Sequence, residues 1–401
     1  MKLIERNRYL NRLKDAMGTP DIKVITGVRR CGKSKLMESF MNFVRTNDPY
    51  ANIVHVNFNL SPSENLTEYH ALHDYVEKAY RPGKNNYVFV DEVQMCSGFE
   101  KTINSLHALE KYDIYITGSN AFLLSSDLAT LFTGRTFEVE VFPFSFEEFM
   151  RYFELTDRYD AFTRYIREGG MSGSYLYKTP EAKFDYIADV FNTLIVRDIQ
   201  QKYKVRQMPL MERLCDYLID NISNLTSTRS VAASLTAEQV KTNDRTIGAY
   251  IKYLCSAFAF YRVRRYDIRG KRYLASNEKY YLSDHAFRYA KLGTKNADYG
   301  RMIENIAAVE LLRRGYELYA GMLYKKEIDF VAIRRNEKLY IQVAATVDDP
   351  DTFRREVGPL LKIGDAYPKI ILTRTRQPVY QYEGVKIIDI ADWLAGTENS
   401  V

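Results

Sequence analysis

The first 145 residues alternate between short apolar runs and longer segments in which apolar residues recur every three or four positions. Short apolar runs predict buried strands, and the longer periodicity predicts helices. The predicted strands cover residues 22–26, 53–58, 86–91, 113–117 and 137–142. The predicted helices cover residues 5–17, 33–44 and 61–80. This alternation is typical of an α/β domain, and here it predicts a parallel five-stranded sheet.

After residue 145 the pattern becomes mostly helical and remains so to about Lys204. The region begins with Ser145-Phe146-Glu147-Glu148, a capping box in which Ser145 and Glu148 can bond each other's backbone N–H groups. We therefore expect a helical region next to the α/β domain.

Residues 209–283 combine three predicted helices with a hairpin of two strands. The helices cover residues 210–222, 230–235 and 247–254, and the strands cover residues 260–266 and 280–282. This order is typical of a winged helix, in which the third helix is presented to DNA and the hairpin forms the wing. Winged helices also serve as protein–protein modules, so both interpretations stay open.

The pattern of apolar residues in the rest of the chain predicts a small mixed α/β domain. Its elements are a helix at residues 301–314, strands at 327–333 and 338–343, a helix at 352–363 and a strand at 369–372.

Between the first predicted strand and its helix lies the pattern GxxxxGK[ST], which is a phosphate-binding loop. Glycines allow the backbone N–H groups to turn inward toward phosphate oxygens, and the start of the following helix adds positive potential. The lysine of the pattern would reach the β- and γ-phosphates, and its serine would ligate Mg²⁺. The predicted nucleotide-binding residues are Gly27, Val28, Arg29, Arg30, Cys31, Gly32, Lys33, Ser34 and Lys35.

Two carboxylates, Asp91 and Glu92, end the third predicted strand. Ligands in open α/β sheets bind beyond the carboxyl ends of the strands. Asp91 can therefore hold Mg²⁺, and Glu92 can polarise the attacking water. A solvated acidic strand end is the alternative.

Two further catalytic candidates follow. Asn120 (or Ser119) comes just after the fourth strand and could reach the γ-phosphate or the water, although Gly-Ser-Asn is also a common turn. Arg135 precedes the fifth strand and could act as an arginine finger on a neighbouring subunit's nucleotide. An ordinary surface arginine is the other interpretation.

The hairpin after the three helices is strongly basic and contains one acid, Asp267. Such a concentration favours contact with DNA phosphates. The candidate contacts are Arg262, Arg264, Arg265, Arg269, Lys271 and Arg272.

The C-terminal domain carries acids in the places that a metal-dependent nuclease would use. Glu304 lies on a helix, Asp329 on one strand and Gln342 on the next. The lysine expected two positions after Gln342 is replaced by Ala344, so this centre is expected to be degenerate. Lys325 or Lys326 could substitute by reaching across.

Composition agrees with a multi-domain globular protein. The 401 residues carry a formal net charge of +6, which is mildly basic and compatible with nucleic acid. Four isolated cysteines suggest neither a disulfide framework nor a zinc site. No apolar run approaches membrane-spanning length and the N-terminus does not resemble a signal peptide, so we expect a cytoplasmic protein without a membrane partner.

The motifs taken together resemble one family, the bacterial and archaeal AAA+-type P-loop ATPases that carry a winged helix and a restriction-endonuclease-like C-terminal domain of unknown function. The motifs behind this resemblance are the loop at 27–34, Val90-Asp91-Glu92, residues 117–120, Gly134-Arg135 with residues 143–149, Arg197-Asp198, residues 265–267, 279–282 and 326–330. The resemblance implies an ATPase core at 1–145, a helical lid at 146–205, a winged helix at 206–292 and a PD-(D/E)xK-like domain at 296–401. It also implies ATP and Mg²⁺ as ligands, with the roles given above for Lys33, Ser34, Asp91, Glu92 and Asn120.

The expected function is ATP hydrolysis that drives a module binding double-stranded DNA or a protein partner, with a homo-oligomer if Arg135 acts in trans. Two alternatives stay open: an ATP-dependent regulatory switch with slow hydrolysis, and an ATP-driven, metal-dependent DNA nuclease.

Overall fold

The computed structural model of the chain describes residues 3–118, 132, 134–293 and 298–396. By internal packing the chain divides into two compact units. The first unit comprises Met1–Pro143 and Val196–Tyr203, and the second comprises Phe144–Ile195 and Lys204–Val401.

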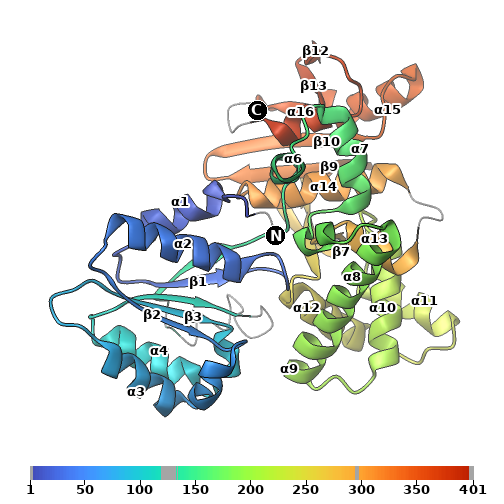
Figure 1. Cartoon of the computed structure of the whole chain (residues 1–401). Coiled ribbons are helices and arrows are strands. Elements are labelled where there is room, and N and C mark those ends of the chain that lie inside the picture. Colours follow the sequence, from blue (N-terminus) through green and yellow to red (C-terminus); the bar gives the residue numbers. More distant parts are fainter. Residues whose placement is uncertain (1–2, 119–131, 133, 294–297, 397–401) are drawn as a thin grey trace. The chain divides into compact units, whose positions relative to one another are not determined.

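The first unit is built on a five-stranded, all-parallel sheet with the order β2-β3-β4-β1-β5 (Figure 1). The strands are β1 (Ile22–Thr26), β2 (Asn52–Asn57), β3 (Asn86–Asp91), β4 (Asp113–Thr117) and β5 (Thr136–Glu140). The helices are α1 (Asn7–Ala16), α2 (Lys33–Asn47), α3 (Tyr69–Ala79) and α4 (Phe99–Ala108), with short turns η1 (Ser61–Leu66) and η2 (Val93–Met95). The predicted α/β P-loop fold with a parallel five-stranded sheet is confirmed.

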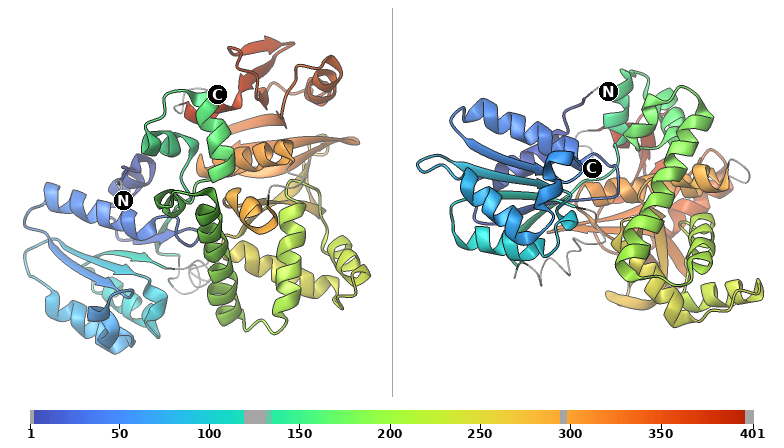
Figure 2. Two further views of the ribbon diagram at one scale, coloured as in Figure 1. Left: turned by 45° about the vertical axis from the view of Figure 1, so that its right-hand side comes forward. Right: turned by 60° about the horizontal axis from the view of Figure 1, so that its bottom comes forward.

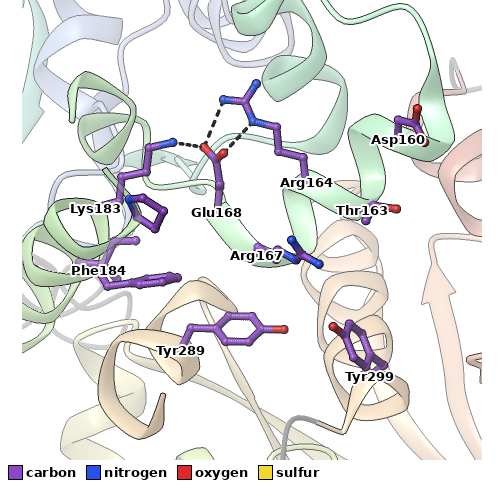
Figure 3. Close-up of a pocket in the computed structure, with 11 residues that line it drawn as sticks. Asp160, Thr163, Arg164, Arg167, Glu168, Lys183, Phe184, Tyr289 and Tyr299 are labelled. Atoms are coloured by element: carbon purple, nitrogen blue, oxygen red, sulfur yellow. Dashed lines mark hydrogen bonds and ion pairs between the residues drawn. The ribbon is translucent and has the colours of Figure 1, made fainter. Parts of the chain in front are cut away.

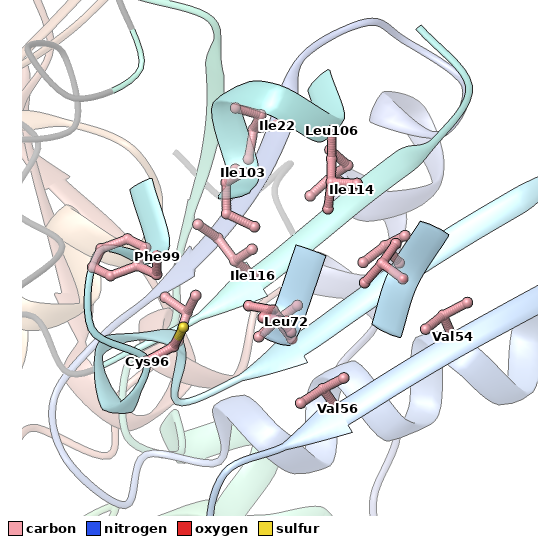
Figure 4. Packing of buried hydrophobic residues seen from close by; sticks show 14 of the residues in the cluster. Ile22, Val54, Val56, Leu72, Cys96, Phe99, Ile103, Leu106, Ile114 and Ile116 are labelled. Atoms are coloured by element: carbon pink, nitrogen blue, oxygen red, sulfur yellow. The ribbon is translucent and has the colours of Figure 1, made fainter. Parts of the chain in front are cut away.

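Helices cover both faces of this sheet, with α1 and α2 on one face and α3 and α4 on the other (Figure 1). Side chains alternate between the faces, which explains why β1 and β3 are buried along their whole length. Toward α3 and α4, Val88 and Ile116 join an aliphatic core (Figure 4). On the other face, Phe40 of α2 packs against Phe89 and Tyr115.

The second unit contains an eight-stranded mixed sheet with the order β12-β13-β11-β10-β9-β8-β6-β7 (Figures 1 and 2). Its strands are β6 (Phe260–Asp267), β7 (Arg272–Leu282), β8 (Glu317–Leu323), β9 (Lys326–Arg334), β10 (Glu337–Ala344), β11 (Lys369–Thr373), β12 (Tyr380–Tyr382) and β13 (Val385–Asp389). Helix α14 (Tyr299–Arg313) packs against β7 to β10, and α15 (Pro350–Leu361) packs against β9, β10, β11 and β13.

Most of the remaining helices of the second unit lie close to where the sequence predicts them, whereas α13 and α16 were not predicted. They are α6 (Phe146–Phe153), α7 (Arg158–Glu168), η3 (Ser172–Leu176), α8 (Pro180–Thr193), α10 (Met208–Asp220), α11 (Thr228–Ala237), α12 (Asp244–Ser256), α13 (Ala286–Leu292) and α16 (Ile390–Ala395). The capping box at Ser145 forms, because Glu148 N–H donates to Ser145 Oγ and Ser145 N–H donates to Glu148 Oε2. Between α8 and residue 203 the helix continues as a π-helical turn, Leu194–Gln200, and α9 (Gln201–Tyr203).

The hairpin β6–β7 differs from the free wing that the sequence suggests. β6 pairs in parallel with β8, with Arg264 opposite Tyr319 and Tyr266 opposite Gly321. One sheet therefore crosses the expected boundary between residues 206–292 and 296–401. The physical reason is that β6, which buries Phe260, Val263 and Tyr266, would otherwise have an open edge with unpaired backbone groups, and pairing with β8 satisfies these groups.

The helical region 146–205 also does not stand alone. α16, from the C-terminal end of the chain, packs against α6 and α7. Residues 144–195 thus belong to the second unit, whereas 196–203 belong to the first. None of the helices in the described parts of the chain is both long and apolar enough to span a bilayer.

Candidate functional site

The phosphate-binding loop connects the buried strand β1 to the start of α2, in the first unit. Gly27 has a φ of 135°, and a Cβ atom on it would lie 2.1 Å from the carbonyl oxygen of Val141. Gly32 has a φ of 103° and forms the N-cap of α2. Only glycine tolerates these conformations without strain, so the two glycines of the motif fix the curvature of the loop.

Lys33 folds back over the loop that precedes it. Its Nζ donates hydrogen bonds to the carbonyl oxygens of Gly27, at 2.9 Å, and of Val28, at 3.2 Å. The side chain is buried, whereas the neighbouring Ser34 is exposed. The ammonium thus lies directly at the loop, where its charge can act on an anion bound there.

Asp91 lies at the carboxyl end of β3, at the same edge of the sheet as the loop. It is buried, and Thr117 at the end of β4 donates a hydrogen bond from Oγ1 to Asp91 Oδ1. Thr117 Oγ1 also accepts a hydrogen bond of 3.1 Å from the backbone N–H of Glu92. Thr117 therefore joins the two acidic residues. The sequence analysis assigned no residue to this role.

Glu92 follows directly and adopts a left-handed backbone conformation, with a φ of 58°. Its Oε2 accepts a hydrogen bond of 2.5 Å from Gln94 Nε2. A non-glycine residue in this region is strained, and such strain is common at functional sites. The turn directs the chain away from the strand and leaves Glu92 half-buried beside the buried Asp91.

Arg6 fixes the loop from a segment that carries no motif. Its guanidinium donates to the carbonyl oxygens of Cys31, at 2.9 Å, and of Phe142, at 2.8 Å. The side chain is buried, so these are strong charge-assisted bonds. Arg6 thereby holds the phosphate-binding loop next to Phe142, which lies just after β5. No local pattern in the sequence could have revealed this contact.

Arg29 connects the loop to the helical segment at 196–203, which is part of the first unit. Its Nη1 lies 3.2 Å from Oδ1 of Asp198, whose side chain is 8% exposed. Cys31, also in the loop, is fully buried, and this burial raises the pKa of its thiol. A reactive thiolate is therefore not favoured at this position.

The other two predicted catalytic residues are Asn120 and Arg135. Asn120, like Ser119, lies outside the described residues. Arg135 is exposed and comes directly before β5, where its carbonyl oxygen accepts from the N–H of Ile22. Because β1 and β5 are parallel, this is the edge of the sheet opposite the loop. Arg135 therefore lies away from its own chain's loop.

The basic hairpin exposes part of its predicted DNA-contacting set. Arg262, Arg264 and Lys271 are exposed, and Arg262 pairs weakly with Glu278 at 3.9 Å. These side chains can offer positive charge to a phosphate backbone.

The other predicted DNA-contacting residues either pack against a neighbouring side chain or are less exposed to solvent. Arg269 lies over the ring of Tyr324, with the guanidinium carbon 5.2 Å from the ring centroid. Arg265 is only half-exposed. Arg272 begins β7, and its side chain lies outside the described part of the chain.

The acids predicted for the nuclease-like centre converge on a lysine that the sequence reasoning missed. Lys279 of β7 is buried, and its Nζ lies 2.8 Å from Glu304, 2.5 Å from Glu327 and 3.5 Å from Asp329. Tyr281, two residues later on the same strand, donates a hydrogen bond of 2.7 Å to Glu304.

Lys279 thus occupies the centre in place of the suggested substitutes, because Lys325 and Lys326 are both exposed. Gln342 is turned aside: its Oε1 accepts from the N–H of Asp329 at 3.3 Å, and its Nε2 donates to Glu356 at 2.9 Å. In the described residues no group of three or more His, Cys, Asp or Glu side chains is arranged to hold a metal ion. Of the three residues predicted for a degenerate nuclease centre, Glu304 and Asp329 form an ion-pair cluster with Lys279, and Gln342 bonds to Glu356.

Acidic groups outnumber basic groups in this cluster, since three carboxyl groups surround one ammonium. The carboxylates hold the pKa of Lys279 well above its usual value despite the burial. Burial and the nearby Glu304 raise the pKa of Asp329 to about 8. Asp329 therefore holds a proton in the folded protein well above the pH at which an exposed aspartate loses it.

Comparison with known proteins supplies the family. A family described as an AAA domain matches residues 19–150. A domain of unknown function, DUF8612, matches residues 159–298.

Two relatives match nearly the whole chain. An uncharacterized protein of Haemophilus influenzae is 34% identical over 400 residues and is covered over 98% of both chains. The uncharacterized protein MJ1544 of Methanocaldococcus jannaschii is 25% identical over 414 residues, which is 98% of this chain and 90% of that protein.

Solved structures match less closely. Cdc6p from Pyrobaculum aerophilum aligns with 77% of this chain and 95% of its own, with a TM-score of 0.32 and 10% identity. AMPPCP-bound DnaA from Aquifex aeolicus aligns with 63% of this chain and 89% of its own, with a TM-score of 0.32 and 16% identity.

The Haemophilus influenzae protein is similar along its full length, and the AAA domain covers the strands and loop described above. This chain therefore belongs to the same family as that protein, and its N-terminal part is an AAA-type P-loop domain.

Proposed function

We propose that the first unit binds ATP with Mg²⁺ and hydrolyses it. The observation that carries this proposal is the meeting of three features at one edge of the sheet: the glycine loop with Lys33, the buried Asp91 held by Thr117, and Glu92. Phosphate binding, metal binding and activation of water need these three kinds of group together.

The residues present fit a triphosphate with its metal ion. Gly27 has no room for a side chain, as a narrow backbone cradle requires, and Lys33 can exchange its two carbonyl bonds for phosphate oxygens. Ser34 and Asp91 would hold Mg²⁺, which when bound neutralises charge on the phosphate oxygens. Glu92 would orient the attacking water and accept its proton, while Thr117 keeps Asp91 in place.

Two variants separate binding from hydrolysis. Lys33→Ala is expected to lose nucleotide binding, measured by titration with a fluorescent ATP analogue. Glu92→Gln is expected to keep binding and to lower steady-state phosphate release by about 10²–10⁴-fold, the usual contribution of a general base. Lys78→Ala and Asp74→Asn, two exposed residues of α3, serve as matched controls. Full turnover in both Lys33→Ala and Glu92→Gln would refute the proposal.

We propose double-stranded DNA as a partner of the exposed basic hairpin. Exposed Arg262, Arg264 and Lys271 support this, because phosphate contacts release counterions and dominate affinity. In fluorescence anisotropy with a labelled duplex, Arg264→Ala/Lys271→Ala should weaken binding and lower the salt dependence by up to ~2 ions. Arg354→Ala, an exposed arginine on α15, is the control. If the wild type and the Arg264→Ala/Lys271→Ala variant bind the duplex with equal affinity and equal salt dependence, the hairpin would instead be expected to contact a protein partner.

We propose that Arg135 acts in trans within a homo-oligomer. Its exposure and its place at the edge of the sheet away from its own loop support this. Mixing the inactive Lys33→Ala protein with Arg135→Ala protein should restore part of the ATPase activity if intact sites form between subunits. Light scattering with ATP that finds only monomers would contradict the oligomer.

A regulatory switch is the second candidate function, and the Arg29–Asp198 pair favours it. A phosphate bound in the loop would compete with Asp198 for Arg29 and so release the segment at 196–203. Slow basal turnover that a duplex or protein partner accelerates would support a switch. Fast turnover that no partner changes would contradict it.

We propose that the cluster around Lys279 is structural and that the C-terminal domain does not cleave DNA. The ammonium at 2.5–3.5 Å from three carboxylates supports this, because it already supplies the positive charge that a metal would bring. Plasmid incubated with the protein and Mg²⁺ or Mn²⁺ should stay intact. Cleavage that Asp329→Ala abolishes would restore the nuclease interpretation.

A further inference from the structure

The second unit contains a cavity of about 750 Å³ that takes no part in the phosphate site. Four helices line it: α7, α8, α13 and α14 (Figure 3). Its volume lies within the range of pockets that bind small organic ligands. Most of its wall belongs to the region matched by the domain of unknown function.

Positive charge exceeds negative charge on one side of this cavity. Arg164 Nε and Lys183 Nζ each lie 2.7 Å from Glu168, on different oxygens of its carboxylate. Arg167 of α7 lines the cavity as well and makes no ion pair with the described residues. Three cations and one carboxylate on this side leave two positive charges, which matches the charge of a phosphate monoester. The other acid of the lining, Asp160, is also on α7 and has its own partner in Arg376 at 3.6 Å.

Aromatic rings form the other side. Phe184 and Tyr289 lie with their ring centroids 6.3 Å apart, and the angle between the ring planes is 33°. Tyr299 is exposed, and Figure 3 shows its hydroxyl and that of Tyr289 directed toward one another beside Arg167. Rings at this spacing beside a cationic wall offer a stacking surface for a planar group.

One polar group at the cavity has no partner. Tyr289 is 6% exposed, and its hydroxyl makes no hydrogen bond within the described part of the chain. Buried hydroxyl groups are normally paired, and an unpaired one needs an explanation such as a ligand. The side chains that lie over it, Arg167 and Tyr299, are both exposed and can move to admit one.

From these observations we infer that the cavity binds a nucleoside monophosphate. The phosphate would lie against Arg167 and Lys183, and the base would stack against the aromatic side of the cavity. The Tyr289 hydroxyl would bond to the ligand, which gives this buried group the partner it lacks. The inference does not depend on ATP hydrolysis in the first unit.

Isothermal titration calorimetry on the full chain tests this inference. The protein carries Lys33→Ala, so that the phosphate loop contributes little binding. AMP, CMP, GMP and UMP are titrated in turn, and ribose 5-phosphate and adenosine supply the phosphate and the base separately. At least one nucleotide should bind about tenfold or more tightly than either half, because both sides of the cavity contribute. Failure of all four nucleotides to bind, or equal binding of ribose 5-phosphate, overturns the inference.

Variants then locate the bound nucleotide. Arg167→Ala should weaken binding by about tenfold, as loss of a charge-assisted bond does, and Tyr289→Phe by about three- to tenfold. Neither removes an internal hydrogen bond or ion pair found in the structure, so the fold should persist. Arg229→Ala, an exposed arginine on α11, is the matched control. Unchanged affinity in both cavity variants, or equal loss in the control, assigns the nucleotide to another place and overturns the inference.

Discussion

Gly27 shows how much a single residue determines in the phosphate loop. An added Cβ would collide with the carbonyl oxygen of Val141 at 2.1 Å, and the φ of 135° is itself unfavourable for other residues. Both effects act in the folded state, where the loop is packed against Val141, just after β5. The conformation of the loop therefore depends on this position lacking a side chain.

Gly27→Ala is expected to destabilise the first unit by about 2–5 kcal/mol, from backbone strain and the collision together. Urea unfolding followed by circular dichroism measures this loss. Gly83→Ala is the matched control, because Gly83 has a φ of 75° with nothing within 4 Å of its Cβ position. The control should lose only about 1–2 kcal/mol. Equal losses in the two variants would show that the collision is unimportant.

Asp329 makes the stability of the second unit depend on pH. The pKa of this carboxyl is about 8 in the folded protein, above its usual value of 3.8. The folded state therefore binds the proton more tightly, and this stabilisation is present at low pH and is lost as pH rises from about 4 to 8. Lys279 is charged throughout that range in both states, because its folded pKa is raised above 10.5, and it adds no slope there.

Asp329→Asn should flatten this dependence. The free energy of unfolding of the wild-type second unit should fall between pH 5 and pH 8 more steeply than that of the variant, measured by urea titrations at each pH. Asp365→Asn, which changes an acid of the same unit at the other end of β10, controls for general charge effects. Parallel pH profiles for the wild type and Asp329→Asn would contradict the assignment.

At the scale of elements, the Arg29–Asp198 pair joins the loop to the helical segment at 196–203. Asp198 is 8% exposed, so removal of the Arg29 guanidinium takes away a favourable charge interaction of a buried carboxylate. Arg29→Ala should therefore speed amide hydrogen exchange in this segment, measured by mass spectrometry. Glu38→Ala, which removes the exposed Lys35–Glu38 pair on α2, should change exchange little. Unchanged protection at 196–203 would show that the pair does not hold the segment.

Elements with a strong local pattern could be predicted from the sequence. The run of Ile22–Thr26 before a glycine loop fixes a strand, and the apolar period from Leu36 to Val44 fixes a helix, because both signals lie within a few residues. The same holds for the acids at the end of β3. These local signals sufficed for the α/β fold and for Lys33, Asp91 and Glu92 as candidates.

Features that depend on distant residues could not be predicted. The pairing of β6 with β8 brings together segments more than 50 residues apart, and no local pattern records it. Lys279 meets Glu304, 25 residues away, only because α14 packs against β7. Arg6 reaches residues 25 and 136 positions away. Thr117 could have been suspected, since the sequence places it at a strand end beside Asp91.

At the scale of the whole molecule, the two compact units should unfold separately. Scanning calorimetry of the full chain is expected to show two transitions, because each unit has its own core. ATP with Mg²⁺ should raise the temperature of only one transition, by the linkage between binding and folding. Lys33→Ala should abolish that increase. A single transition that shifts as a whole would show that the two units unfold cooperatively.

The close approach of Gly27 to Val141 has a mechanical consequence. The loop has no clearance on this side, and Arg6 ties its Cys31 carbonyl to the carbonyl of Phe142. The polypeptide leaves the first unit immediately afterwards, at Pro143. A displacement of the loop by a few tenths of an ångström is thus transmitted through close contacts to residues 141–143, where the chain leaves the first unit.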